Sequence, residues 1–318
     1  MELRHEQEWR EGAGPRVAYA PDGAAWATAS PYGLAIYEHD ALAASVPSPG
    51  GLLGELTFAP DGRTVLVAPH AYDRAASAWA PLPSPYDALL GDLDPDAAAG
   101  FELYAAAWAT DGGALALYGE SRAPRGIGAG PGPGGPDARL VVADGRTGAR
   151  EALLLEGERS HPHAALLAAP GFVAAGGDPV GVWERPTGRP LAVLEGLGTL
   201  ARTLRLSPDG RHLAAGAAGG RVAVWETDGW RQRAAWAAHP DEAAALAFHP
   251  GGAALLTGGA DGRIVPWTLD GEPAAEGAQL AGRVQGLAFR PDGARLLATQ
   301  AAPDAAVIAY AVTAAPRG

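Results

Sequence analysis

Short apolar strands that end in a tight turn recur along the whole sequence. Large apolar residues alternate with other residues in segments such as Leu56–Phe58, Leu204–Leu206 and Leu287–Phe289, and a period of two places their side chains on one face of a sheet. Proline and glycine in the turns that follow favour a chain reversal. Turns of this kind begin at Pro21, Pro60, Thr110, Pro170, Pro208, Pro250 and Pro291, at intervals of 38 to 60 residues. The pattern therefore predicts seven copies of one β unit.

Each copy contains enough residues for four strands. In most copies a third strand ends in an aromatic residue, such as Tyr37, Trp183 or Trp225, and a fourth apolar segment follows. Trp79 is the expected equivalent in the second copy. Four strands in about 40 to 45 residues make one blade of a β-propeller. We therefore predict an all-β protein, a seven-bladed β-propeller with four antiparallel strands per blade, in which residues 1–318 form a single domain.

The two ends of the chain predict how the ring closes. The last copy ends after its third strand, near Val312, and a strand-like segment at Leu3–Trp9 precedes the first copy. A blade cannot bury both of its faces alone, so neighbouring blades must stack and the ring must close. We expect the N-terminal strand, residues 3–9, to complete the last blade by pairing with Ala306–Val312.

Composition narrows the function classes. The formal net charge is −12 and all 24 basic residues are arginine, without the basic stripe that marks a nucleic-acid-binding surface. The absence of cysteine excludes disulfides, thiolate catalysis and cysteine-ligated zinc. The charged N-terminus does not resemble a signal peptide, and no apolar run of about 18 residues predicts a membrane span. We expect a cytoplasmic monomer without cofactor, nucleic-acid partner or membrane contact.

The sixth copy carries the most specific motif. His239 precedes its turn, and Thr257, Asp261 and Trp267 follow at regular positions. This unit resembles the WD repeat, named for tryptophan and aspartate. The resemblance implies a buried structural tetrad in which Asp261 accepts from His239, His239 contacts Thr257, and Thr257 meets the indole N–H of Trp267.

Other copies depart from that motif. The fifth has Gly219 where the aspartate is expected, and Asp178 in the fourth lies one residue closer to Trp183. Pro266 falls inside the third strand of the sixth copy, which predicts a lost ladder hydrogen bond and a local bulge.

Two groups of residues are candidate metal ligands, and one segment is a candidate phosphate loop. Asp92, Asp94 and Asp96 alternate as in a calcium loop, although alanine occupies the position at which such a loop requires glycine. His161 and His163 have no convincing third ligand. The glycine-rich segment 126–132 is followed by no predicted helix, so it is interpreted as a linker. An acidic surface loop is the alternative for the aspartates.

Long insertions in the second to fourth copies are the candidate partner-binding region. The segments His70–Arg74, Leu93–Glu102 and Ser121–Asp137 are expected on one face of the ring; the alternative is that they are tolerated surface insertions. They contain residue types that are enriched at interfaces, namely Tyr72, Arg74, Phe101, Arg122 and Arg125.

These observations predict a non-catalytic scaffold that binds an unidentified protein partner, as the resemblance to WD repeats implies. One alternative is a propeller enzyme, a lactonase, glycosidase or quinoprotein-like oxidoreductase, acting at the central channel. The innermost strands disfavour it because Glu55 and Arg205 are scattered charges among apolar residues. A calcium-stabilised binding module is the third possibility.

Overall fold

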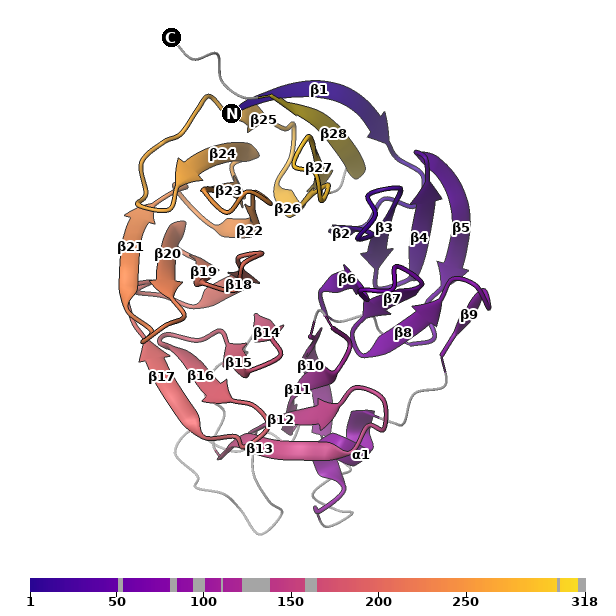
Figure 1. Ribbon diagram of the computed structural model, residues 1–318, viewed down its shortest axis with the longest axis vertical. Coiled ribbons are helices and arrows are strands. Elements are labelled where there is room, and N and C mark those ends of the chain that lie inside the picture. The colour runs from indigo at the N-terminus through magenta and orange to yellow at the C-terminus, as the bar shows by residue number, and fades with distance from the viewer. Residues whose placement is uncertain are drawn as a thin grey trace.

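The chain folds into a ring of seven sheets around a central channel (Figure 1). The computed structural model describes residues 1–50, 54–80, 85–93, 101–109, 111–121, 138–157, 165–301 and 304–313. Over these ranges each sheet has four antiparallel strands. The predicted seven-bladed β-propeller is therefore confirmed.

The strands of each blade follow one another outward from the channel. The innermost strands of blades one to seven are β2 (Arg16–Tyr19), β6 (Leu56–Phe58), β10 (Phe101–Trp108), β14 (Leu166–Ala168), β18 (Ala201–Leu206), β22 (Ala243–Phe248) and β26 (Val284–Phe289). The second strands are β3 (Ala25–Ser30), β7 (Thr64–Val67), β11 (Ala114–Ser121), β15 (Phe172–Ala175), β19 (His212–Ala217), β23 (Ala254–Gly259) and β27 (Arg295–Gln300). The third strands are β4 (Gly33–Glu38), β8 (His70–Asp73), β12 (Ala138–Asp144), β16 (Val180–Glu184), β20 (Arg221–Glu226), β24 (Arg263–Thr268) and β28 (Ala306–Thr313). The outermost strands are β5 (Ala41–Pro47), β9 (Ala78–Trp79), β13 (Arg150–Gly157), β17 (Pro190–Leu194), β21 (Gln232–Ala237), β25 (Ala278–Gln279) and, in blade seven, β1 (Glu2–Trp9).

The N-terminal strand closes the ring. Strand β1 pairs with β28 from Glu2 opposite Thr313 to Trp9 opposite Val307, which confirms the predicted pairing. The register shifts between His5 and Gln7, so Glu6 forms a bulge.

The core lies between adjacent blades, because the faces of neighbouring sheets stack on each other. One buried cluster joins Ala174 and Val182 of blade four to Leu204 and Trp225 of blade five. Alanine at the centre of many sheets, for example Ala174, which is fully buried, lets the blades approach closely. The large apolar residues that alternate in the sequence thus form the contacts between blades.

Helix α1 (Pro85–Leu90) is the only helix in the described ranges. It belongs to the connection between blades two and three, and it packs on β11 and β12 of blade three. No helix in the described part of the chain is long and apolar enough to cross a membrane.

The antiparallel topology gives the ring two distinct faces. One face carries the turns between the second and third strands together with the links between blades, and we call it the link face. The opposite face carries the turns after the first and third strands, including the Pro-Asp-Gly turns.

Two local predictions were wrong. The aromatic residue at the end of the third strand of blade two is Tyr72 in β8, whereas Trp79 lies in the outermost strand β9. Residues His70–Asp73 are consequently strand rather than insertion. The disruption expected at Pro266 lies on the outer side of β24. The register between β23 and β24 is continuous, whereas the ladder between β24 and β25 is only two pairs long and the bridge of Trp267 to Pro273 is out of its register. The missing N–H of proline is thus accommodated on the outer side of the blade.

Candidate functional site: the channel and the link face

Blade six contains a buried chain of four hydrogen-bonded side chains. His239 Nδ1 lies 3.1 Å from Asp261 Oδ1, and His239 Nε2 lies 2.8 Å from Thr257 Oγ1. The indole Nε1 of Trp267 donates to Thr257 Oγ1 at 3.0 Å. Because the carboxylate of Asp261 only accepts, Nδ1 of His239 donates to it and Nε2 accepts from the threonine hydroxyl. Burial lowers the pKa of His239 despite the opposing effect of Asp261, so the neutral imidazole is favoured.

The structure thus brings together the four residues expected from the sixth copy, in the order expected. Their arrangement ties the link before β22 to strands β23 and β24 of the same blade. Thr257 is fully buried and His239 is 5% exposed. This geometry gives the four residues a structural role inside the blade.

Thr28 in β3 is the counterpart of Thr257 in blade one, although no motif in the sequence marks it. The residue is fully buried, and its hydroxyl donates to the carbonyl of Gly12 at 3.2 Å. A backbone carbonyl therefore occupies the place that His239 takes in blade six. A partner of this kind leaves no residue type in the sequence by which it could be recognised.

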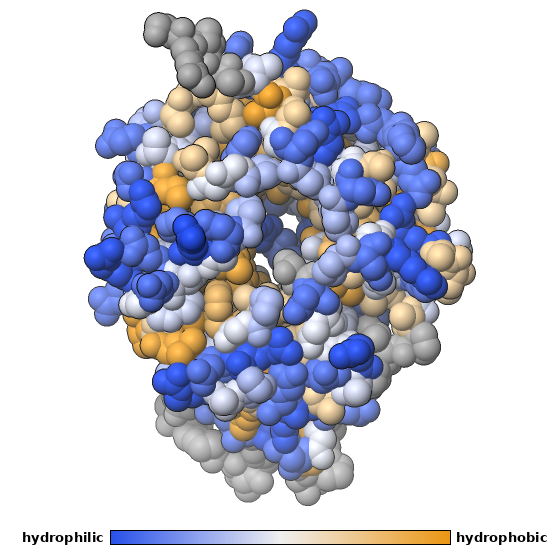
Figure 2. All heavy atoms as spheres, in the orientation of Figure 1, coloured by the Kyte–Doolittle hydropathy of each residue, from blue (hydrophilic) through white to orange (hydrophobic). Residues whose placement is uncertain are grey.

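An ion pair crosses the central channel. The channel wall encloses a cavity of about 190 Å³ and comes from the innermost strands of six blades; Figure 2 shows the opening at the centre of the ring. Of the described residues that line it, Glu55 and Arg205 are charged. Nη2 of Arg205 in blade five donates to Oε2 of Glu55 in blade two at 2.8 Å.

The charge of Glu55 is stabilised by its surroundings. Burial alone would raise the pKa of its carboxyl, but the guanidinium groups of Arg205 and Arg16 outweigh that effect and lower the pKa. The rest of the cavity wall is mainly apolar and includes Val17 and Leu167. Among its described lining residues, the channel therefore holds one ionised carboxylate neutralised by arginine.

Four of the innermost strands contain a bulge at the link-face end of the channel. Near their first residues, β10, β18, β22 and β26 all shift register, which leaves one unpaired residue in each strand. These residues are Tyr104, Arg202, Ala244 and Gln285. The side chain of Arg202 is 39% exposed and Tyr104 is 45% exposed. Bulges commonly re-aim side chains at functional sites.

Comparison with protein families accounts for two segments of the ring. A family model described as "WD domain, G-beta repeat" matches residues 188–226 and 230–265. Each match begins at the outermost strand of one blade and extends into the third strand of the next. These two matches and the seven-bladed fold support a WD-repeat propeller family for this chain. No curated protein matches it.

The same offset between sequence repeat and blade explains the closure of this propeller. In sequence, the outermost strand of one blade precedes the three inner strands of the next. Strand β1 therefore belongs, as a repeat element, with β2–β4 of blade one, although it pairs with β28 in blade seven. An offset of this kind joins the first and last blades by a full ladder of hydrogen bonds.

Of the partner-binding residues expected from sequence, the three that the structure describes do not form a common surface. Tyr72 and Phe101 are only 2% and 7% exposed, so their side chains are unavailable to a partner, and this prediction was wrong. Arg74 lies after β8 on the opposite face, where its Nη2 donates to Glu38 Oε1 at 2.6 Å. Arg122 and Arg125 lie outside the described residues.

The expectation failed for a physical reason that the sequence does not show. Tyr72 packs in the cluster between blades one and two, and Phe101 begins a long strand opposite Ser121. Aromatic residues at these positions serve the contacts between and within blades. Tyr72 and Phe101 are residues of the type found at interfaces, but the contacts they make lie inside the ring.

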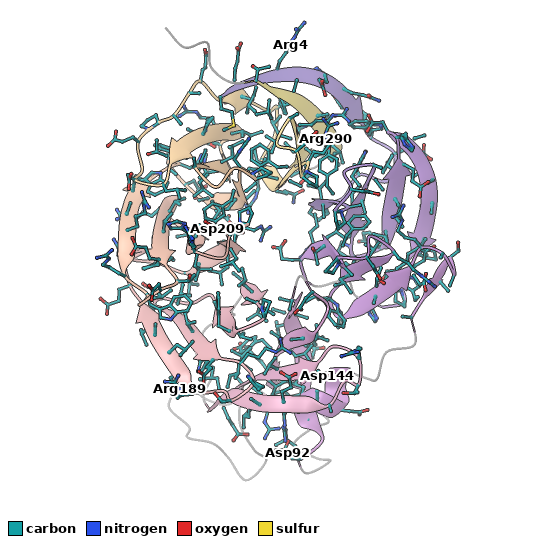
Figure 3. The ribbon with its side chains drawn as sticks, viewed as in Figure 1. Arg4, Asp92, Asp144, Arg189, Asp209 and Arg290 are labelled. Atoms are coloured by element: carbon teal, nitrogen blue, oxygen red, sulfur yellow. The ribbon has the colours of Figure 1, made fainter. Side chains whose placement is uncertain are left out.

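Asp92, the first candidate calcium ligand, lies at the outer edge of blade three (Figure 3). It accepts from Nη1 of Arg139 at 2.6 Å and from Nη1 of Arg150 at 2.7 Å, and these hydrogen bonds lower the pKa of its carboxyl. Asp94 and Asp96 lie outside the described residues, as do His161, His163 and the glycine-rich segment 126–132. Within the described ranges no three acidic or histidine side chains are grouped so that they could hold a metal ion.

Arg139 in β12 fastens the helical connection to blade three. Its side chain is 4% exposed, and Nη1 also donates to the carbonyl of Leu89 in α1 at 3.0 Å. The guanidinium group forms a further ion pair with Glu156 of β13. One buried cation therefore holds α1, Asp92 and the outermost strand together.

Proposed function

We propose that this WD-repeat propeller is a non-catalytic scaffold that binds a protein partner on its link face. Two aromatic residues are among the exposed large apolar side chains in the described ranges, and both belong to that face. Tyr32, in the turn between β3 and β4, is 87% exposed, and Tyr104 is 45% exposed. Exposed tyrosine is enriched in protein interfaces. This observation carries the proposal.

The residues of the opposite face also favour the link face as the docking surface. Arg63 donates to Asp73, Arg189 to Glu184 and Arg231 to Glu226, each within its own blade. Such exposed ion pairs contribute little, and among the described residues no exposed large aromatic side chain belongs to this face. The opposite face is therefore the poorer docking surface.

Chemistry at the channel is the alternative, and the ion pair weighs against it. A general acid at neutral pH needs a raised carboxyl pKa, whereas the pKa of Glu55 is lowered. The same shift makes Glu55 a weak general base. We propose in addition that the protein acts as a monomer in the cytoplasm without a cofactor, in keeping with its cysteine-free composition.

Site-directed photo-crosslinking tests the proposed face. A benzophenone amino acid replaces Tyr32 or Tyr104 on the link face, and Arg189 or Arg231 on the opposite face as matched controls. The latter two side chains are 64% and 77% exposed, so the probe is accessible on both faces. In the native cells we expect a defined partner protein from the link-face positions only. Equal or preferential crosslinking from Arg189 and Arg231 would refute the proposal.

A further inference from the structure

Two arginines share one carboxylate at the link-face rim of the channel. Nη2 of Arg283 lies 2.7 Å from Oε2 of Glu242, and Nε of Arg202 lies 3.8 Å from Oε1 of the same residue. We call these three residues the arginine rim. They come from three consecutive blades, because Arg202 lies in β18, Glu242 directly precedes β22 and Arg283 directly precedes β26.

Burial within the arginine rim is unequal. The side chain of Glu242 is 16% exposed, whereas those of Arg202 and Arg283 are 39% and 41% exposed. Glu242 is thus more buried than the two arginines, and its ion pair of 2.7 Å holds Arg283 in place. The rim carries two positive charges and one negative charge in a chain whose net charge is −12.

Arg202 is only loosely engaged by this carboxylate. Its separation of 3.8 Å from Glu242 exceeds a hydrogen-bond distance, so the interaction is electrostatic. Arg202 is the residue that the bulge in β18 leaves without a partner in β19. A guanidinium group presents five donors in a planar fork that fits a carboxylate through two parallel hydrogen bonds. The rim therefore offers positioned donors to an incoming carboxylate.

We propose that the arginine rim binds an acidic segment of a partner protein. The proposal rests on the proposed function, since it specifies the chemistry of the partner that the link face takes. Glutamate or aspartate side chains of the segment pair with Arg202 and Arg283, and the amide of Gln285 at the neighbouring bulge provides a further polar contact. A nucleic acid fits less well, because phosphate backbones require an extended cationic track.

Binding of a model peptide tests this chemistry directly. The probe is a short fluorescein-labelled peptide of alternating glutamate and alanine, with glutamine and lysine versions for comparison, and the readout is fluorescence anisotropy with the full-length protein. We expect the glutamate peptide to bind and the other two not to bind. The double variant Arg202→Gln, Arg283→Gln should weaken binding about a hundredfold, because each of the two lost charge-assisted contacts contributes on the order of a tenfold change.

A charge-matched variant distinguishes pairing of the peptide with Arg202 and Arg283 from an effect of the net charge of the protein. The double variant Arg189→Gln, Arg231→Gln removes the same two positive charges from the opposite face, so both doubles have the same net charge. We expect the control to bind the glutamate peptide like the unmodified protein. An equal loss in both doubles, or no binding of the peptide by the unmodified protein, overturns the proposal. Competition by inorganic phosphate at concentrations equal to those of the peptide also overturns it, since it would indicate a simple anion site.

The outcomes distinguish this inference from the proposed function. If the peptide fails to bind while photo-crosslinks still map to Tyr32 and Tyr104, the acidic partner is excluded and the link-face scaffold stands. Crosslinks that map to Arg189 and Arg231 refute the scaffold proposal itself, whatever the peptide does. Thermal unfolding of each double variant verifies that the ring is intact.

Discussion

Arg205 and Glu55 are 150 residues apart in sequence and form an ion pair of 2.8 Å across the channel. Their blades, five and two, are not neighbours in the ring. The contact therefore links opposite sides of the propeller through its centre. It also places the charged groups of the described channel wall in contact with each other, in a cavity that is otherwise mainly apolar.

Loss of the Glu55 charge should lower stability in a pH-dependent way. The pKa of Glu55 in the folded protein lies below its ordinary value of 4.5, so its contribution is fully present above that pH and is lost as the pH falls through the folded-state value. Glu55→Gln should reduce the free energy of unfolding by up to about 1 kcal/mol at neutral pH, since both side chains are partly exposed. Urea denaturation at neutral and acidic pH measures the difference, which should disappear in acid. A difference that is independent of pH would contradict this account.

Removal of the Thr257 hydroxyl should be costly because it serves two buried partners. Thr257→Val keeps the shape but leaves the indole N–H of Trp267 without its acceptor and Nε2 of His239 without its donor. We expect a loss of about 2 to 4 kcal/mol in the free energy of unfolding. The matched control is Thr28→Val, which removes a single bond to the Gly12 carbonyl and should cost about 1 kcal/mol. Equal losses in the two variants would show that the hydrogen-bonded chain in blade six contributes no more to stability than the single hydrogen bond in blade one.

Arg139→Met should loosen α1 from blade three. The substitution removes the donor to the Leu89 carbonyl and leaves the carboxylates of Asp92 and Glu156 without their shared cation. We expect faster amide hydrogen exchange in residues 85–93 and a loss of about 2 kcal/mol or more in stability. Exchange in blade five, β18–β21, should be unchanged and provides the internal control. Unaltered exchange in residues 85–93 would mean that other contacts hold the helix.

Ring closure should depend on Arg295. This residue of β27 pairs with Glu6 of β1 at 2.9 Å and with Asp40 of blade one at 2.7 Å, and its guanidinium group lies over the ring of Trp9. Arg295→Gln should lower the free energy of unfolding by about 1 to 3 kcal/mol and speed proteolysis of β1.

Arg290→Gln provides the control for the closure experiment. Arg290 pairs with Asp292 in its own turn, and its side chain is 34% exposed, so we expect a change within about 0.5 kcal/mol. If limited proteolysis removes β1 equally fast from both variants, Arg295 has no special part in closure.

Much of the fold could be predicted from sequence because a propeller is a repeated local pattern. The alternation at Leu204 and Leu206, and the turn at Pro208 after it, recur often enough to reveal seven units. The pairing of β1 with β28 followed from counting strands. The positions of His239, Thr257, Asp261 and Trp267 also derive from spacing within one blade, where the strand register converts sequence distance directly into spatial distance.

The surface could not be predicted in the same way, because residue type does not say which side of a blade a side chain occupies. Tyr72 and Phe101 have the composition of an interface but are buried within the ring. Arg202 and Arg283 are ordinary arginines in the sequence, and only the ring places both beside Glu242.

The sequence by itself determined the number of blades, their strand order and the hydrogen-bonded residues of blade six, since all of these depend on local periodicity and turn chemistry. Only the tertiary structure decided which charges meet. The pairs Arg205 with Glu55 and Arg295 with Asp40 join blades that are distant in sequence, and their contact depends on the closed circle. Closure brings residues of every blade to one axis, and no local pattern in the chain encodes that convergence.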